Sequence, residues 1–302
     1  MEEKSVMAKN LIGEYWHLCS PGELSGILFK NTDDYIFGMN LVALCAGVFK
    51  NDVSILTFQL MSNHVHFIMH GRKENVERFF EEFRKRLSKY MAQKGYSSDC
   101  KGFTHNIFRI EDEIYLRNSI AYVNRNGYLV NKDYTPFSYP WGSNRYFFNL
   151  TDDNTLKVKI GKKSIRERKS IFHTHFNEFP ENYYFVGKYI SPMCYIAIDE
   201  ANRIFKDAHH YLNSITRRVE TYGEIAKQLG DRITYTDEEI SNAIYSLSFK
   251  KFNTSPKGLD KMQKIDIAKE LHFNYNAGNK QIKRVLRIDE EIINELFPDK
   301  IK

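Results

Sequence analysis

The feature that most constrains the fold is a long apolar stretch that a short polar break divides in two. Residues 53–71 read "VSILTFQLMSNHVHFIMHG", which is rich in β-branched and aromatic residues. Such runs are typical of buried strands, and the intervening Met61, Ser62 and Asn63 are suited to a turn. We therefore expect two adjacent strands here. The second strand carries two histidines that are one residue apart.

His64 and His66 belong on one face of that strand. Side chains at i and i+2 of a strand point the same way, about 6.5 to 7 Å apart, so Val65 between them points into the opposite layer. Two parallel imidazoles can bind a divalent ion if another element supplies a further ligand. The alternative is that they are core histidines whose polar atoms are satisfied by hydrogen bonds, and the spacing alone leaves both readings open.

The rest of the chain predicts a mixed α and β first half and a helical second half. Short strands are expected within residues 13–22 and 26–35. Helices are expected over residues 33–49, 73–95 and 112–127, from their apolar spacing and their capping residues. The predicted organisation is a catalytic domain over 1–150, a basic linker over 151–191 and a helical domain over 192–302.

Within the helical domain, residues 260–289 have the proportions of a helix-turn-helix, which is also a common form of plain scaffolding. The side chains expected to project from its second helix are mostly basic or amide-bearing: Lys280, Gln281, Lys283, Arg284 and Arg287.

Basic residues are locally concentrated although the overall charge is modest. The 302-residue chain has a formal net charge of +6. One cluster comprises Arg84, Lys85, Arg86 and Lys89, and the segment from Lys157 to Lys169 carries seven Lys or Arg against one Glu. Such surfaces suit phosphate backbones, although a run of charge also serves as a solvated face. Nucleic acid is one partner class that this pattern allows.

Composition indicates a folded, cytoplasmic protein. Hydrophobic residues make up 42% of the chain, which is enough for a packed core. No apolar run reaches the roughly 18 residues that a membrane span requires, and the N-terminus lacks a signal-peptide pattern. The four cysteines are scattered without a CxxC pair, so reduced thiols are expected.

A helix downstream of the histidine pair carries Tyr122 and Asn126. These positions are four residues apart, so their side chains share one helix face. An Asn carbonyl is an oxygen ligand for Mg²⁺ or Mn²⁺, and a phenol beside a bound phosphate can act as a nucleophile. The alternative for Tyr122 is aromatic packing, because the chain has 19 tyrosines.

Other histidines are weaker candidates for a metal site. His70 lies at the end of the same strand, and His173 with His175 repeats the spacing in a basic segment where a surface or phosphate-contacting role is expected. His209 and His210 are adjacent in sequence and diverge by about 100° on a helix.

Taken together, "MSNHVHFIM", the following basic helix and "YLRNSIAYVNRNGYLV…YPWGS" resemble the single-tyrosine HUH transposases, in particular the REP-associated tyrosine transposase branch of these insertion-sequence-type enzymes. The resemblance covers about residues 13–143. It implies a ferredoxin-like (RRM-like) α+β domain with an antiparallel sheet that cuts and rejoins single-stranded DNA.

The resemblance also implies roles for individual residues. Tyr122 would be the nucleophile that forms a 5′-phosphotyrosine, and His64, His66 and Asn126 would hold Mg²⁺ or Mn²⁺. Single-stranded or hairpin DNA would be the partner in a nucleoid-associated protein, and both monomers and homodimers occur among relatives. The residues expected to hold DNA are basic: Arg84, Lys85, Arg86, Lys89, Lys162, Lys163, Arg166, Arg168, Lys280, Lys283 and Arg284.

The chain departs from the family pattern at three positions. Ser62 and Gly127 stand where relatives usually have Pro, and Gly142 stands where they have Ser. None of these changes removes a reactive atom. Tyr115 and Tyr128 are alternative nucleophiles, but neither has an Asn four residues on. Two alternative functions stay open: a DNA-hairpin-binding regulator that does not cleave, and a metal-dependent hydrolase that uses water.

Overall fold

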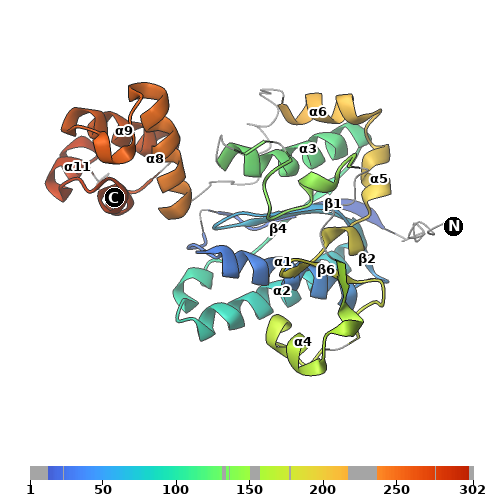
Figure 1. Ribbon diagram of the computed structural model, residues 1–302. Helices are drawn as coiled ribbons and strands as arrows, with labels where there is room; N and C mark the ends of the chain where they lie inside the picture. Colours follow the sequence, from blue (N-terminus) through green and yellow to red (C-terminus); the bar gives the residue numbers. More distant parts are fainter. Residues whose placement is uncertain are drawn as a thin grey trace.

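A β-α-β-β-α-β succession forms the centre of the fold in the computed structural model (Figure 1). The structure describes residues 13–22, 24–130, 134–135, 137–149, 157–176, 178–216, 237–275 and 277–298. The six central elements are β1 (Glu14–Cys19), α1 (Thr32–Val48), β2 (Val53–Leu60), β3 (Val65–Gly71), α2 (Lys73–Gln93) and β4 (Asn106–Ile110). They build a four-stranded sheet in the order β2-β3-β1-β4, and all neighbouring strands are antiparallel. The predicted α+β class with an antiparallel sheet is confirmed.

The predicted pair of adjacent strands is also confirmed. β2 pairs with β3 so that Gln59 lies opposite His66 and Leu60 opposite Val65. A backbone hydrogen bond of 2.8 Å from Met61 N to His64 O closes the turn between the strands. His64 therefore lies at the end of this turn, directly before β3 begins.

One expected strand is absent. Residues 26–31 are not in a strand, and α1 begins at Thr32 with Asn31 as its N-cap. Leu28 and Phe29 are nevertheless fully buried, and both backbone amides donate to the carbonyl of Ser62, at 2.7 and 3.0 Å. The apolar residues that suggested a strand are thus buried by an irregular segment that packs against the β2–β3 turn.

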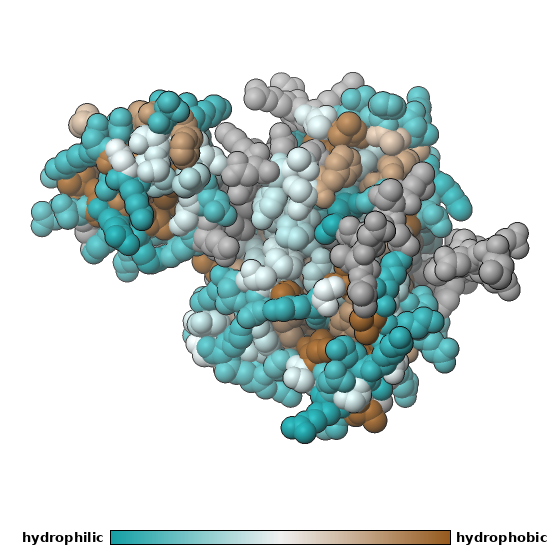
Figure 2. All heavy atoms as spheres, in the orientation of Figure 1, coloured by the Kyte–Doolittle hydropathy of each residue, from teal (hydrophilic) through white to brown (hydrophobic). Residues whose placement is uncertain are grey.

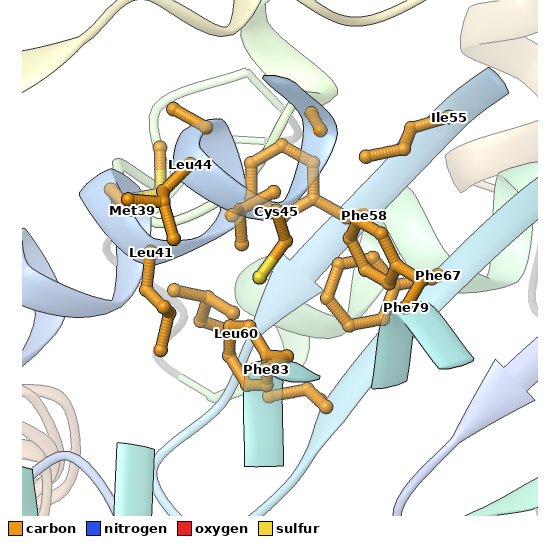
Figure 3. Packing of buried hydrophobic residues seen from close by; sticks show 14 of the residues in the cluster. Met39, Leu41, Leu44, Cys45, Ile55, Phe58, Leu60, Phe67, Phe79 and Phe83 are labelled. Atoms are coloured by element: carbon orange, nitrogen blue, oxygen red, sulfur yellow. The ribbon is translucent and has the colours of Figure 1, made fainter. Parts of the chain in front are cut away.

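Helices cover both faces of the sheet. α1 and α2 pack on one face, where alternate strand residues such as Phe58, Leu60 and Phe67 meet Cys45 and Phe83 (Figure 3). The other face is covered by α3 (Glu113–Val130), α5 (Ile198–Arg203) and α6 (Ala208–Thr216), which lie on the opposite side of the strands from α1 and α2 in Figure 1. The sheet thus separates the layer that it forms with α1 and α2 from the layer that it forms with α3, α5 and α6.

The edge of β2 that does not pair with β3 is covered by two segments from distant parts of the chain. At one end, Leu60 N donates to Trp141 O at 2.8 Å and Ser143 N donates to Phe58 O at 3.1 Å. At the other end, Ala197 N donates to Ile55 O at 2.8 Å. Covering an edge in this way removes a row of backbone groups that would otherwise template pairing with another chain.

The region predicted as a linker over 151–191 is largely folded. Residues 151–156 lie outside the described part, but β5 (Lys157–Lys159), α4 (Ile165–Phe172), β6 (Tyr184–Val186) and β7 (Tyr189–Ile190) follow, the strands in the order β5-β6-β7. Aromatic residues explain the difference, because side chains such as Phe172, Tyr183 and Phe185 are buried in the same core as α1. The segment is therefore not an extended connector, because its own apolar side chains pack into that core.

The helical region divides into two parts. α5 and α6 pack with α3, whereas the last helices belong to another cluster, which includes Ile244, Ile267, Leu271 and Ile282 and also Met61 and Tyr139. The elements of that cluster are α8 (Asp237–Phe252), α9 (Lys261–Asn274), α10 (Asn279–Leu286) and α11 (Glu290–Leu296). α9 and α10 are the helix pair expected from the sequence. No helix in the described ranges combines the length and apolar content needed to cross a bilayer.

Five short 3₁₀ helices complete the described structure. They are η1 (Ser97–Cys100), η2 (Asn144–Tyr146), η3 (Ile160–Lys162), η4 (Pro192–Cys194) and η5 (Pro256–Gly258).

Candidate functional site

The sheet face toward α3 is unusually polar where β1 and β3 run side by side. His66 on β3 faces this layer, while its neighbour Val65 belongs to the core on the α1 side, as expected from strand alternation. β1 contributes His17, which the sequence reasoning missed because a single His in "EYWHLC" gives no spacing signal. His17, His64 and His66 are all buried, with exposed fractions of 0 to 1%.

The three imidazoles lie in contact. The ring centroids of His64 and His66 are 4.9 Å apart with their planes nearly perpendicular, at 87°. His17 Nε2 lies 3.2 Å from His66 Nδ1, which places one proton in a hydrogen bond between the two rings. His64 Nδ1 lies 2.8 Å from the side-chain oxygen of Asn63. Hydrogen bonds of this kind fix the orientation and tautomer of an imidazole.

α3 places Tyr122 against this histidine cluster. The Tyr122 ring centroid is 5.7 Å from that of His66, at an interplanar angle of 90°, and 6.2 Å from that of His17. Neighbouring Ile120 and Val123 are fully buried, so the helix is held on the sheet by its apolar side chains. Tyr122 itself is 3% exposed. The structure therefore brings together residues from β1, β3 and α3.

Asn126 lies one turn further along α3 and is also buried, at 2% exposed. Its side-chain nitrogen Nδ2 has no hydrogen-bond partner among the described residues. The next residue, Gly127, donates its N–H to Gln59 Oε1 at 3.2 Å, and Gln59 is the β2 partner of His66. This contact ties the end of α3 to the strand that faces the histidines.

A glycine is required after Asn126 for a steric reason. A Cβ on Gly127 would lie 2.1 Å from Cγ of Tyr139, which is far inside van der Waals contact. Tyr139 is 1% exposed and its hydroxyl donates to Leu60 O at 2.7 Å, so its ring is fixed. The glycine at this position thus fits the close approach of α3 to Tyr139.

A second buried network supports the same helix. Thr57 donates to Asn124 Oδ1 at 2.5 Å and lies 2.7 Å from Ser143 Oγ. Asn124 Nδ2 donates to the hydroxyl of Tyr211 on α6 at 2.7 Å. Ser143 Oγ also accepts from Phe58 N at 3.0 Å. These polar groups satisfy one another inside the layer, which fixes α3 relative to β2 and α6.

Within the described residues, a metal site would have to combine histidine ligands with a ligand of another kind. No three His, Cys, Asp or Glu side chains in the described ranges are arranged to hold a metal ion. A third ligand beside His64 and His66 would therefore have to be of another kind. The buried amide of Asn126, one turn beyond Tyr122, is the candidate that the sequence offers, although its atom without a hydrogen-bond partner among the described residues is the donor Nδ2, which is not itself a metal ligand. Imidazole nitrogen and amide oxygen are a donor set that divalent ions accept.

The other histidines and tyrosines lie elsewhere. His70 stacks on Tyr15 at 4.6 Å and pairs with Glu200 at 3.4 Å. His173 ends α4, on the far side of the sheet from Tyr122. Tyr115 is partly buried at the start of α3, where burial raises the pKa of its phenol. The side chain of Tyr128 lies outside the described residues.

The basic residues do not gather around Tyr122. Arg84 and Arg86 lie on α2, on the opposite face of the sheet, and form ion pairs with Glu81 and Glu82, each at 2.6 Å. Arg284 on α10 donates from Nη2 to Asp237 at 2.7 Å. The remaining predicted DNA-binding residues are distributed over α2 (Lys85, Lys89), η3, α4 and their connection (Lys162, Lys163, Arg166, Arg168) and α10 (Lys280, Lys283).

Comparisons with known proteins give a single remote similarity to report. No protein-family model matches the chain, and no match is found among curated proteins. One solved structure, a REP-associated tyrosine transposase bound to a REP hairpin, is similar with a TM-score of 0.35 and 13% sequence identity. The alignment covers 51% of this chain and 96% of that one. A similarity at this level does not assign the chain to a family.

Proposed function

We propose that this protein is an HUH-type tyrosine transposase that cuts and rejoins single-stranded or hairpin DNA. The observation that carries the proposal is the contact between Tyr122 and His66, with His64 adjacent. Two sequence elements that are more than fifty residues apart, "HVH" and the helix "SIAYVNRN", meet on one sheet face. On this proposal the β-α-β-β-α-β sheet is the ferredoxin-like domain of that class.

The proposed reaction is a transesterification in two halves. Tyr122 Oη attacks the scissile phosphorus, a P–O bond to tyrosine forms, and the bond from phosphorus to the 3′ oxygen breaks. The phenol proton is transferred overall to the departing 3′ oxygen, which leaves as a hydroxyl. A 3′ hydroxyl, from the same or another DNA end, later attacks the 5′-phosphotyrosine and restores the phosphodiester. The energy of the broken bond is kept in the phosphotyrosine, so joining needs no nucleotide cofactor.

The surrounding residues have separate tasks in this proposal. His64, His66 and Asn126 would hold Mg²⁺ or Mn²⁺, which supplies a Lewis acid that offsets charge on the phosphate oxygens. His17 orients the His66 ring through the hydrogen bond between their nitrogens. Thr57, Asn124 and Ser143 hold α3 on β2, so that the Tyr122 ring keeps its place beside His66.

A second candidate function is a regulator that binds DNA hairpins without cutting them. The observation that favours it is burial: Tyr122, His64, His66 and Asn126 are each 3% exposed or less. A phosphodiester reaches these side chains only after neighbouring residues move. Cleavage therefore requires an opening of this layer, whereas a regulator does not.

The two candidates are separated by incubating the full-length chain with single-stranded hairpin DNA and Mn²⁺ or Mg²⁺ and resolving the products on a denaturing gel. The transposase proposal expects a covalent protein–DNA adduct that is lost in Tyr122→Phe and retained in the control Tyr115→Phe. Binding without cleavage would favour the regulator. Cleavage that persists in Tyr122→Phe would instead indicate a hydrolase that uses water, and would overturn the proposal.

A further inference from the structure

A cavity lies on the opposite side of the sheet from Tyr122, between α1, the end of α2 and the folded segment that follows β5. Its volume of about 390 Å³ is within the range of small-ligand sites, roughly 300 to 1,000 Å³. The aromatic part of its wall is formed by Phe37, Tyr90, His173 and Phe185. The surface over α4 and β6 combines apolar and hydrophilic side chains (Figure 2). Nothing in the proposed cleavage reaction uses this cavity.

The cavity is built from fixed side chains. Phe37 and Tyr90 stack with centroids 3.8 Å apart and planes within 8°, and both are 6% exposed. The His173 ring meets both of them edge-on, at 5.3 and 5.5 Å. His173 is held there by the left-handed backbone, φ 49°, that ends α4. The aromatic wall is therefore preformed.

The hairpin on the other side is fixed by one buried amide. Asn40 Nδ2 donates to Lys188 O at 3.0 Å, and Asn40 Oδ1 accepts from Ile190 N at 3.0 Å. Both polar ends of this fully buried side chain are thus used to hold the β6–β7 turn against α1. As a result Lys188 is kept at the wall of the cavity.

The charged groups of the wall favour an anion that also carries hydrogen-bond donors. Lys163 and Lys188 line the cavity, and Lys163 belongs to the basic segment between Lys157 and Lys169. Lys163 also contacts the exposed carboxylate of Glu167 at 3.2 Å. Asp33 is the acidic residue in the wall. Lysine suits phosphate as a point charge, and a carboxylate accepts a hydrogen bond from the exocyclic amino group of cytosine.

We propose that this cavity holds one unpaired nucleotide, with its base against the aromatic wall, its phosphate at Lys163 and Lys188, and its exocyclic amino group donating to Asp33. The exposed His173 ring is the part of this wall that a base can stack on, because Phe37 and Tyr90 stack on each other and are only 6% exposed. Stacking on a ring beside positive charge is how proteins bind bases of single strands. The inference rests on the proposed function only in taking nucleic acid as the partner. The ligand is either a free nucleotide or a nucleotide within a DNA strand, since both present the same chemistry.

The test is fluorescence anisotropy of a labelled ten-nucleotide oligodeoxycytidylate with the full-length chain, in EDTA so that cleavage is not measured. The double variant Lys163→Ala/Lys188→Ala is expected to weaken binding by about tenfold or more, because it removes the phosphate contacts. Lys169→Ala is the matched control: this residue lies at the end of the same basic segment, is exposed, does not line the cavity and is not among the residues expected to hold DNA. It is expected to change binding less than about threefold.

Further arms identify the ligand. Asp33→Ala is expected to weaken binding of oligodeoxycytidylate more than that of oligothymidylate, because thymine lacks the exocyclic amino group. Competition by dCMP would identify a free nucleotide as a sufficient ligand, and binding of the oligonucleotide without such competition would assign the site to a strand. Absence of binding to both probes, or equal losses in Lys169→Ala and the double variant, would overturn the inference.

The outcome is independent of catalysis. A chain that binds here and forms no adduct would contradict the cleavage proposal alone. A chain that forms the adduct but shows no effect of the cavity variants would contradict this inference alone.

Discussion

At the scale of single residues, the polar side chains buried between the sheet and α3 are held by one another. Thr57, Asn124 and Tyr211 form a chain of hydrogen bonds with no break. Such a chain is stabilising only when its members are satisfied, because an unpaired buried polar group costs about 1 to 3 kcal/mol. These contacts account for part of the burial of this polar layer, in which Gln59 Nε2 and Asn126 Nδ2 have no hydrogen-bond partner among the described residues.

The close approach of α3 to Tyr139 gives a prediction at Gly127. In Gly127→Ala the new methyl group overlaps the Tyr139 ring, so α3 or the ring must shift. We expect a loss of about 1 to 3 kcal/mol in the free energy of unfolding, measured by urea denaturation. Gly161→Ala is the control, because no atom lies within 4 Å of its Cβ position. Equal stabilities of the two variants would contradict the steric argument.

At the scale of elements, Asp34 connects α1 to α2. It is fully buried, accepts from Tyr90 Oη at 2.9 Å, and forms an ion pair with Lys94 Nζ at 2.6 Å. It also accepts from Lys30 N at 3.0 Å. The carboxylate is thus the shared acceptor for groups that precede α1 and groups at the end of α2. These contacts hold the helix pair on its face of the sheet.

This role predicts that Asp34→Asn destabilises the chain markedly, because it leaves the Lys94 ammonium without its charge partner. Breaking a buried ion pair by removing one member typically costs about 3 to 5 kcal/mol, and the partial exposure of Lys94 places the expected loss at the low end, roughly 3 kcal/mol. Asp33→Asn on the exposed side of the same turn is expected to change stability by less than about 0.5 kcal/mol. Thermal and urea unfolding of both variants measure the difference; similar losses would contradict the role of Asp34.

α5 is attached to the sheet by a group of titratable residues. Tyr15 Oη donates to Glu200 Oε1 at 2.8 Å, and His70 Nδ1 is 3.4 Å from the same oxygen. The hydrogen bond with Glu200 raises the pKa of His70. Burial opposes ionisation of Glu200, but hydrogen bonds from His70 and Tyr15 keep its pKa below the usual value. Burial, followed by the Glu200 contact, raises the pKa of Tyr15 to about 12.

The raised pKa of His70 fixes the direction of a pH dependence. Its contribution to stability is fully present below the unfolded pKa of about 6.5 and is lost as pH rises through the higher folded pKa. Glu200 contributes above its unfolded pKa of about 4.3. Glu200→Gln is therefore expected to lower the free energy of unfolding by roughly 0.5 to 1 kcal/mol at pH 6 and by less at pH 8.5. In a His70→Asn background the pH dependence should vanish. A difference that grows with pH would contradict this account.

At the scale of the whole molecule, one sheet separates two surfaces with different chemistry. The α3 side holds the histidine cluster and Tyr122, and the α1 side holds the apolar core and the aromatic cavity. The basic residues of α2 and α4 lie on the α1 side, away from Tyr122. A single strand that used both surfaces would have to pass around an edge of the sheet.

Much of this arrangement could be predicted from the sequence, and the failures have physical reasons. Periodicity located β2, β3, α2 and α3, because each has a regular apolar face. It misplaced a strand near Leu28 and treated residues 151–191 as a linker, because irregular segments can bury apolar side chains without any period. His17 gave no signal, since its role depends on β1 lying beside β3. The local spacing of residues in the sequence does not show which distant strands lie side by side.

The central claim is that Tyr122 is the residue that becomes joined to DNA, and peptide mapping of the adduct tests it most directly. Trypsin would cut after Arg109, Arg117, Arg125 and Lys132, which places Tyr115, Tyr122 and Tyr128 on three different peptides. After reaction with hairpin DNA and Mn²⁺, followed by nuclease trimming, mass spectrometry should find the nucleotide remnant on the peptide of residues 118–125. A remnant on residues 110–117 or 126–132, or DNA cleavage without any modified peptide, would contradict the account.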